Sequence, residues 1–190
     1  MLKFFVFGFI VKLITGLDDS LTHVPVMANI TRTRMGKVAF SIGILSAIIT
    51  AIFIAFFFSA VIGNFPYYRY IVSGLIFVLA AAIYFDILIH KPRIKAEKLL
   101  MKQISAARFS KLAGIGFIAA FATVLDDIIA YMPLLHDNVA FTTMGILAAA
   151  ILEIILIVYF AGRIAKLKYK KEISSIGLVL LAILILAGVI

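Results

Sequence analysis

An 18-residue stretch with two adjacent aspartates occurs twice in this chain, and it constrains the fold more than any other feature. Residues 8–25 read GFIVKLITGLDDSLTHVP, and residues 116–133 read GFIAAFATVLDDIIAYMP. The copies are offset by 108 positions without a gap, and eight of the 18 positions are identical. Charged side chains within apolar, membrane-type sequence are costly and are functional by default. The duplication therefore predicts one site built from both halves of the chain.

The apolar content predicts an integral membrane protein. Of the 190 residues, 65% are hydrophobic, and the mean hydropathy is +1.20. Runs of about 18 or more apolar residues with few charges are typical of transmembrane helices. Six such runs are present, with approximate bounds 3–30, 38–63, 68–90, 112–135, 140–163 and 174–190. The predicted fold is all-α, with six transmembrane helices.

The basic residues predict how these helices are oriented. The formal net charge is +9, and the bases cluster in three of the five connections: 31–37, 91–111 and 163–173. Because Lys and Arg are enriched in cytoplasmic loops, these three connections are expected in the cytoplasm and both termini outside. The predicted location is the plasma membrane, crossed several times. Since the bases lie between apolar runs, the positive charge indicates a membrane partner and not nucleic acid.

Three helices in each half predict an inverted repeat. An odd number of spans makes the second half enter the membrane from the opposite side, which relates the halves by a pseudo-two-fold axis in the membrane plane. The expected units are a first three-helix repeat (1–90), a basic cytoplasmic linker (91–111) and a second, inverted repeat (112–190).

Small residues recur every four positions from Ala39 to Ser59. Such a stripe lets helices approach closely in lipid, and it fits internal packing and a homodimer contact equally well. A weaker stripe, Gly145 and Ala149, continues to Glu153 and should turn that acid toward other helices. Two interpretations of Glu153 stay open: a structural group, paired with Lys12 or protonated, and a ligand or proton relay.

The paired acids, Asp18 with Asp19 and Asp126 with Asp127, are the candidate metal ligands. An Asp at the centre of a membrane helix costs about 2.5–3.5 kcal/mol, so four unpaired ones would cost about 10–14 kcal/mol. Lys12 is the one base near their depth, about two turns away, and it cannot neutralise all four. We expect the acids to share protons, to hold a cation, or to do both.

Neighbouring groups extend the expected oxygen shell. Three threonines fall on the helical faces of the acids: Thr15, Thr22 and Thr123. Pro25 and Pro133 follow the two pairs at the same distance, and a proline inside a helix removes one backbone donor. Both prolines are predicted to break their helices and to free the carbonyl oxygens of Leu21 and Ile129 as ligands.

Asp86 and His90 form a second polar pair at the cytoplasmic end of the third apolar run. Residues four apart share a helical face, so the two are candidates for a proton relay at the mouth of a pathway. An ion pair at the membrane interface, next to Lys91, is the alternative interpretation.

Clustered carboxylates suggest a mechanism. In a low dielectric they titrate as a coupled group, so an empty site should hold protons that a divalent cation displaces. Such an exchange, in a two-fold framework that can rock, predicts a proton-coupled transporter and not an enzyme. The expected partners are the lipid bilayer, protons and a divalent cation as substrate, with no resident cofactor.

The two LDD motifs, Leu17–Asp19 and Leu125–Asp127, resemble those of the LysE-type transporter superfamily. The stretch DDIIAYMPL from Asp126 is particularly similar to the second motif of its CadD-like group, and the TerC-like and MntP-like groups carry comparable pairs. The resemblance implies two inverted three-helix repeats and export of a divalent cation such as Mn²⁺, Ca²⁺ or Cd²⁺. Because the chain has no cysteine, the harder ions Mn²⁺ and Ca²⁺ are favoured.

Two alternatives stay open. The same superfamily suggests an exporter of small amino acids, which would need a base at mid-depth to hold the substrate carboxylate. A remote alternative is an intramembrane aspartyl protease, in which two helices each supply one catalytic Asp. The GxGD signature of that class is missing, since the motifs read TGLDD and TVLDD.

Overall fold

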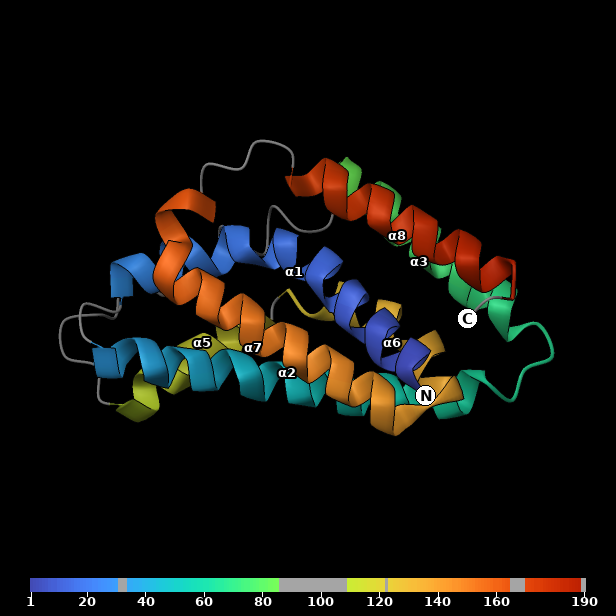
Figure 1. Cartoon of the computed structure of the whole chain (residues 1–190), viewed down its shortest axis with the longest axis horizontal. Coiled ribbons are helices and arrows are strands. Elements are labelled where there is room, and N and C mark those ends of the chain that lie inside the picture. The colour runs from blue at the N-terminus through green and yellow to red at the C-terminus, as the bar shows by residue number, and fades with distance from the viewer. Residues whose placement is uncertain (31–33, 86–108, 122, 165–169, 189–190) are drawn as a thin grey trace.

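The computed structural model describes residues 1–30, 34–85, 109–121, 123–164 and 170–188. Within these ranges the protein is all-helical, as predicted (Figure 1). The seven helices are α1 (Leu2–Ile30), α2 (Arg34–Ile62), α3 (Tyr68–Tyr84), α5 (Phe109–Phe121), α6 (Leu125–Asp137), α7 (Val139–Ile164) and α8 (Lys170–Leu186).

In the part of the chain that the structure describes, two helices are long and apolar enough to cross a bilayer. These segments are Met35–Ile62 of α2 and Val139–Tyr159 of α7, with mean hydropathies of 2.6 and 2.4. They give partial support to the prediction of a membrane protein. The described parts of the three basic connections are helical, namely residues 34–37, 109–111, 163–164 and 170–173. The remaining residues of these connections lie outside the described ranges.

The run 112–135, predicted as one helix, is two helices in the structure. The helix is interrupted between Phe121 and Leu125, directly before the second acidic pair. At the break, the N–H and the Oγ1 hydroxyl of Thr123 both donate to the carbonyl of Ala120, at 3.0 and 2.9 Å. Carboxylates are favoured in the first turn of a helix, where N–H groups lack partners and the helix dipole is positive. The break therefore places the acids at a favourable end of α6.

Neither proline ends a helix, so the prediction that they break their helices is wrong. α1 continues through Pro25, and α6 continues through Pro133. A proline removes one hydrogen bond, and the close packing of α6 around fully buried residues such as Leu134 holds the helix together. The carbonyls of Leu21 and Ile129 stay predicted ligands.

α1 packs along α7, and α2 packs along α5 (Figure 1). In the first interface Gly8 meets the backbone of Thr142, and in the second Gly116 meets the backbone of Phe40. A Cβ atom at either glycine would overlap the carbonyl oxygen it faces. Gly8 and Gly116 occupy the same position of the duplicated segment, so the two interfaces use corresponding residues.

The partner helices show the same correspondence. Gly43 of α2 lies against the carbonyl of Ala113, and Gly145 of α7 lies against the carbonyl of Phe5. Ala113 and Phe5 are 108 positions apart, whereas the two glycines, in GILSA and GILAA, are 102 apart. The shift from 108 to 102 shows that the second half has six fewer residues between its first two matching segments.

α3 and α8 form a third pair beside α1. The hydroxyl of Ser175 donates to the carbonyl of Ala80 across this interface at 2.9 Å. α1 begins and α8 ends at the same end of the molecule, on the right in Figure 1. α2 and α5 begin at the opposite end, on the left.

Candidate functional site

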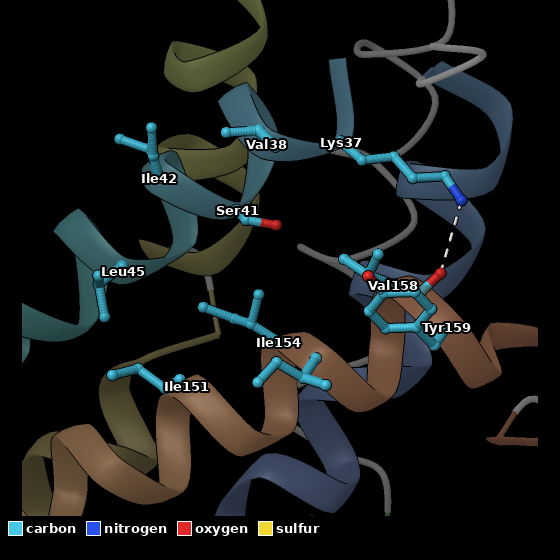
Figure 2. Close-up of a pocket in the computed structure, with 10 residues that line it drawn as sticks. Lys37, Val38, Ser41, Ile42, Leu45, Ile151, Ile154, Val158 and Tyr159 are labelled. Carbon is cyan, nitrogen blue, oxygen red and sulfur yellow. Dashed lines mark hydrogen bonds between the residues drawn. The ribbon is translucent and has the colours of Figure 1, made fainter. Parts of the chain in front are cut away.

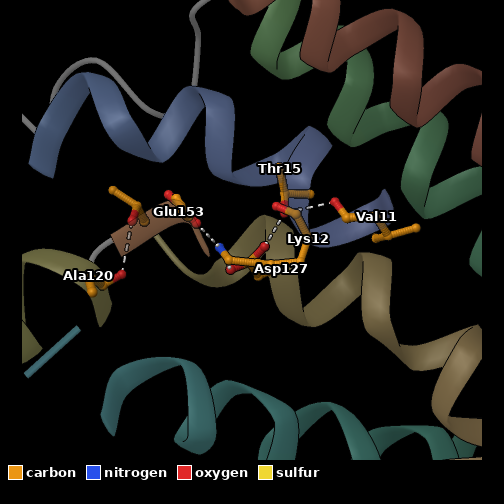
Figure 3. A network of polar contacts seen from close by, with 7 residues as sticks. Val11, Lys12, Thr15, Ala120, Asp127 and Glu153 are labelled. Carbon is orange, nitrogen blue, oxygen red and sulfur yellow. Dashed lines mark hydrogen bonds and ion pairs between the residues drawn. The ribbon is translucent and has the colours of Figure 1, made fainter. Parts of the chain in front are cut away.

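A buried lysine lies between two buried acids in the interior of the bundle (Figure 3). The Nζ atom of Lys12 is 3.0 Å from Oδ2 of Asp127 and 3.3 Å from Oε2 of Glu153. The side chains of Lys12 and Asp127 are 1% and 0% exposed. Helices α1, α6 and α7 each supply one of these groups, which we call the Lys12 centre.

Thr15 holds the second oxygen of the same carboxylate. Its hydroxyl donates to Oδ1 of Asp127, and it also lies 3.2 Å from the carbonyl of Val11. Lys12 and Thr15 are three residues apart and therefore share one face of α1. Both oxygens of Asp127 are thus contacted from α1. The corresponding residue Thr123 donates to the backbone of Ala120 instead.

The helices bring the Lys12 centre to the middle of the bundle. Lys12 and Glu153 lie near the midpoints of α1 and α7. Asp127 is the third residue of α6, so the positive end of the helix dipole helps to stabilise its carboxylate. The break before α6 also lets this acid reach a lysine that is 115 positions away in sequence.

Gly16 makes room for Glu153. A Cβ atom at Gly16 would overlap the carboxylate of Glu153. α7 can approach α1 at this level because the residue one turn beyond Lys12 has no side chain. The sequence interpretation missed Gly16, although the corresponding position of the duplication holds Val124.

The expectation that Lys12 lies about two turns from the acids is corrected for Asp127. Lys12 pairs with that acid and with Glu153, which is the structural interpretation left open for Glu153. The expected separation of two turns assumed that Lys12 would face the acids of its own helix. The interruption between α5 and α6 instead brings Asp127, an acid of the other half, to Lys12.

Several predicted site residues cannot be placed. Asp86 and His90 lie outside the described ranges, and within the helices no side-chain position is described for Asp18, Asp19, Leu21, Thr22, Pro25 and Asp126. Among the described residues, no group of three or more His, Asp or Glu side chains is arranged to hold a metal ion. The metal site at the four aspartates stays a prediction.

The Lys12 centre does not follow the internal repeat. Lys12 corresponds to Ala120 at the spacing of 108, and Glu153 corresponds to Ala51 at the spacing of 102. Both alanines are buried, at 1% and 0% exposure. A charge in one copy opposite an alanine in the other is a sequence signal that could have identified Lys12 as a site residue.

A groove of about 660 Å³ opens between α2 and α7 (Figure 2). Apart from Lys37, Ser41 and Tyr159 its lining is aliphatic, and the Nζ atom of Lys37 donates to the carbonyl of Val158 at 3.5 Å. Among the described residues that line the groove, none is acidic. It therefore lacks the groups that bind a cation, and the Lys12 centre is the better candidate.

No protein-family model, curated protein or solved structure matches this chain.

Proposed function

We propose that the protein is a secondary transporter that exports a divalent metal cation, Mn²⁺, Ca²⁺ or Cd²⁺, by proton-coupled alternating access. The observation that carries this proposal is the gathering of carboxylate and hydroxyl oxygens at one buried position, the Lys12 centre. Two carboxylates, those of Asp127 and Glu153, face one ammonium group. Carboxylate oxygens at a buried position attract cations and protons strongly, because a low dielectric enlarges their electrostatic interaction.

The available ligands suit a hard divalent cation. Carboxylate and hydroxyl oxygens are the ligands that Ca²⁺ and Mn²⁺ prefer. Asp127 and Thr15 provide such oxygens in direct contact with each other. Asp126 is the neighbour of Asp127, and Asp18 and Asp19 lie about one turn beyond Thr15 on α1. The proposed metal site is formed by these four aspartates.

The exposed apolar surface supports the membrane location. Phe53, Phe57, Val78 and Tyr159 are 61–76% exposed. These side chains lie on α2, α3 and α7, and lipid would cover them in a membrane. We propose six spans, with α5 and α6 together forming the fourth, both termini outside and the three basic connections in the cytoplasm.

The matching glycine contacts support the inverted repeat. Gly8 and Gly116 make equivalent backbone contacts, and so do Gly43 and Gly145. A pseudo-two-fold axis that exchanges the two halves produces this kind of correspondence. Together with the LDD motifs, it favours the cation-exporting branch of the LysE-type superfamily.

The position of Lys12 favours a second candidate, the export of a small amino acid. Such a substrate needs a base for its carboxylate and an acid for its ammonium group. Lys12, Asp127 and Glu153 provide both within one buried centre. Replacing Lys12 by Met should abolish binding of an amino acid but not binding of a cation.

Transport into inside-out vesicles tests the primary proposal. Wild-type protein should take up Mn²⁺, Ca²⁺ or Cd²⁺ when a proton gradient is imposed, and Asp127→Asn should abolish this uptake. Asp137→Asn is the matched control, because Asp137 is an exposed acid at the far end of the same helix. Equal uptake by wild type and Asp127→Asn, or no uptake of any of the three ions by wild type, would contradict the proposal.

A further inference from the structure

We infer that Lys12 is a tethered cation that competes with the transported ion for Asp127 and moves to Glu153 when the ion binds. This inference rests on the proposed function, since it describes how the same site is loaded. It assigns separate roles to the two acids: Asp127 binds the ion, and Glu153 receives the lysine.

The geometry allows this exchange with little movement. The Nζ atom of Lys12 already contacts both acids, at 3.0 Å and 3.3 Å. A divalent cation on Asp127 would need the oxygen that Lys12 now contacts, and it would repel the ammonium group in a low dielectric. The lysine would therefore leave Asp127 for the acid that it already touches.

Glu153 keeps the displaced lysine neutralised. A buried ammonium group that lost its partner would be strongly destabilising, so displacement without a second acid would oppose ion binding. Gly16 leaves space for the Glu153 carboxylate directly beside α1, one turn from Lys12. The contact between α1 and α7 therefore persists after the ion has bound.

The exchange also changes which helices are linked. Lys12 and Thr15 both hold Asp127 from α1. When the ion takes Asp127, the link between α1 and α6 weakens, and the link between α1 and α7 strengthens. Because α1 packs far more extensively on α7 than on α6, ion binding would free α6 and leave the larger interface intact.

Binding measurements on purified full-length protein in lipid nanodiscs test the inference. Titration calorimetry with Mn²⁺, Ca²⁺ and Cd²⁺ in turn gives the dissociation constant for wild type and each variant. We expect Lys12→Met to bind about tenfold more tightly, equivalent to about 1.4 kcal/mol, because it lacks the competitor. We expect Glu153→Gln to bind more weakly, because it removes the acid that receives the displaced lysine.

The control and the double variant keep the result interpretable. Lys3→Met removes an exposed lysine from the same helix and should leave the affinity within about twofold of wild type. The double variant Lys12→Met/Glu153→Gln has the same formal charge at the centre as wild type and should also bind more tightly. It replaces Lys12→Met if that variant does not fold.

The outcomes separate the inference from the proposed function. If wild type binds a divalent cation and neither Lys12→Met nor the double variant binds more tightly, Lys12 is a structural partner and not a competitor. Tighter binding by Glu153→Gln would also overturn the inference. A purely structural ion pair would lower the melting temperature of both single variants without moving their affinities in opposite directions. If wild type binds none of the ions, the proposed function itself fails.

Discussion

Lys12 and Asp127 join the two halves of the chain through a contact of 3.0 Å between Nζ and Oδ2. The residues are 115 positions apart in sequence, and both are fully buried. Removing one member of a buried ion pair leaves an uncompensated charge, whereas replacing both with apolar groups is often neutral. Measuring the stability of both kinds of variant therefore distinguishes a buried ion pair from charged groups that lie close together without stabilising one another.

The first prediction concerns the stability of this pair. Asp127→Asn should lower the free energy of unfolding by up to about 3–5 kcal/mol, reduced to the extent that Glu153 still holds Lys12. The triple variant Lys12→Met/Asp127→Leu/Glu153→Gln removes all three charges of the Lys12 centre and should recover most of that loss. Circular dichroism during unfolding by detergent measures both. Asp137→Asn, an exposed control, should change stability by less than about 0.5 kcal/mol, and an equal loss in the control would show that the pair is not special.

The acids could be found from the sequence because duplication and membrane-type hydropathy mark them. The contact of Lys12 with Asp127 could not be found in this way. Whether Lys12 meets the acids of its own helix or those of the other half depends on the break before α6. That break lies within the apolar segment AAFATVL, residues 119–125, where hydropathy gives no indication of a helix end. The prolines, which did suggest helix ends, are accommodated inside α1 and α6.

The small-residue stripe on α7 predicted the orientation of Glu153 but not its partner. Gly145 and Ala149 correctly predicted that this acid faces other helices, and it is 8% exposed. The choice between a structural partner and a ligand needed the position of Lys12 on a different helix. Sequence periodicity defines the face of one helix, but it does not say which residue of another helix lies opposite.

The second prediction concerns the space beside Glu153. Gly16→Ala should lower the melting temperature and weaken cation binding, because the new Cβ would overlap the Glu153 carboxylate. Gly114→Ala is the control, since nothing lies within 4 Å of a Cβ atom at Gly114. There, alanine should stabilise the helix by about 0.5–1 kcal/mol. Thermal unfolding followed by circular dichroism measures stability, and calorimetry measures binding. A similar response of the two variants would mean that Gly16 has no such role.

The third prediction concerns the corresponding interfaces. Gly8→Val and Gly116→Val should destabilise the protein by similar amounts, because each side chain would overlap a backbone carbonyl of a neighbouring helix. Gly74→Val should have little effect, since a Cβ atom there has open space. Melting temperatures of the three variants provide the comparison. A large effect at only one of the two interface glycines would count against equivalent interfaces in the two halves.

The fourth prediction separates the two threonines. Thr15→Val should lower the free energy of unfolding by about 1.5–3 kcal/mol, because a buried carboxylate loses a hydroxyl donor. Thr123→Val should cost only about 0.5–1.5 kcal/mol, since its hydroxyl donates to a neutral carbonyl. Thr15→Ser retains the hydroxyl and should recover most of the loss. Equal losses in the two valine variants would mean that the contact with Asp127 contributes nothing beyond an ordinary hydrogen bond.

The fifth prediction concerns membrane orientation, and the absence of cysteine makes it simple to test. Asn64 and Asp137 are exposed at one end of the bundle, where the rings of Tyr68 and His136 lie 4.9 Å apart. Met35 and Ser110 are exposed near the beginnings of α2 and α5, at the other end (Figure 1). In single-cysteine variants, a membrane-impermeant maleimide should label positions 64 and 137 in intact cells. Positions 35 and 110 should react only after permeabilisation.

This pattern is expected because the basic residues beside positions 35 and 110 favour the cytoplasm. If positions 35 and 110 were labelled in intact cells and positions 64 and 137 were protected, the orientation would be the reverse of the predicted one. The bundle would still cross the membrane. Labelling of all four positions in intact cells would mean that the two ends of the bundle are not separated by a bilayer. In that case the Lys12 centre would lie in a protein interior and not on a path across a membrane, and the transport proposal would lose its physical basis.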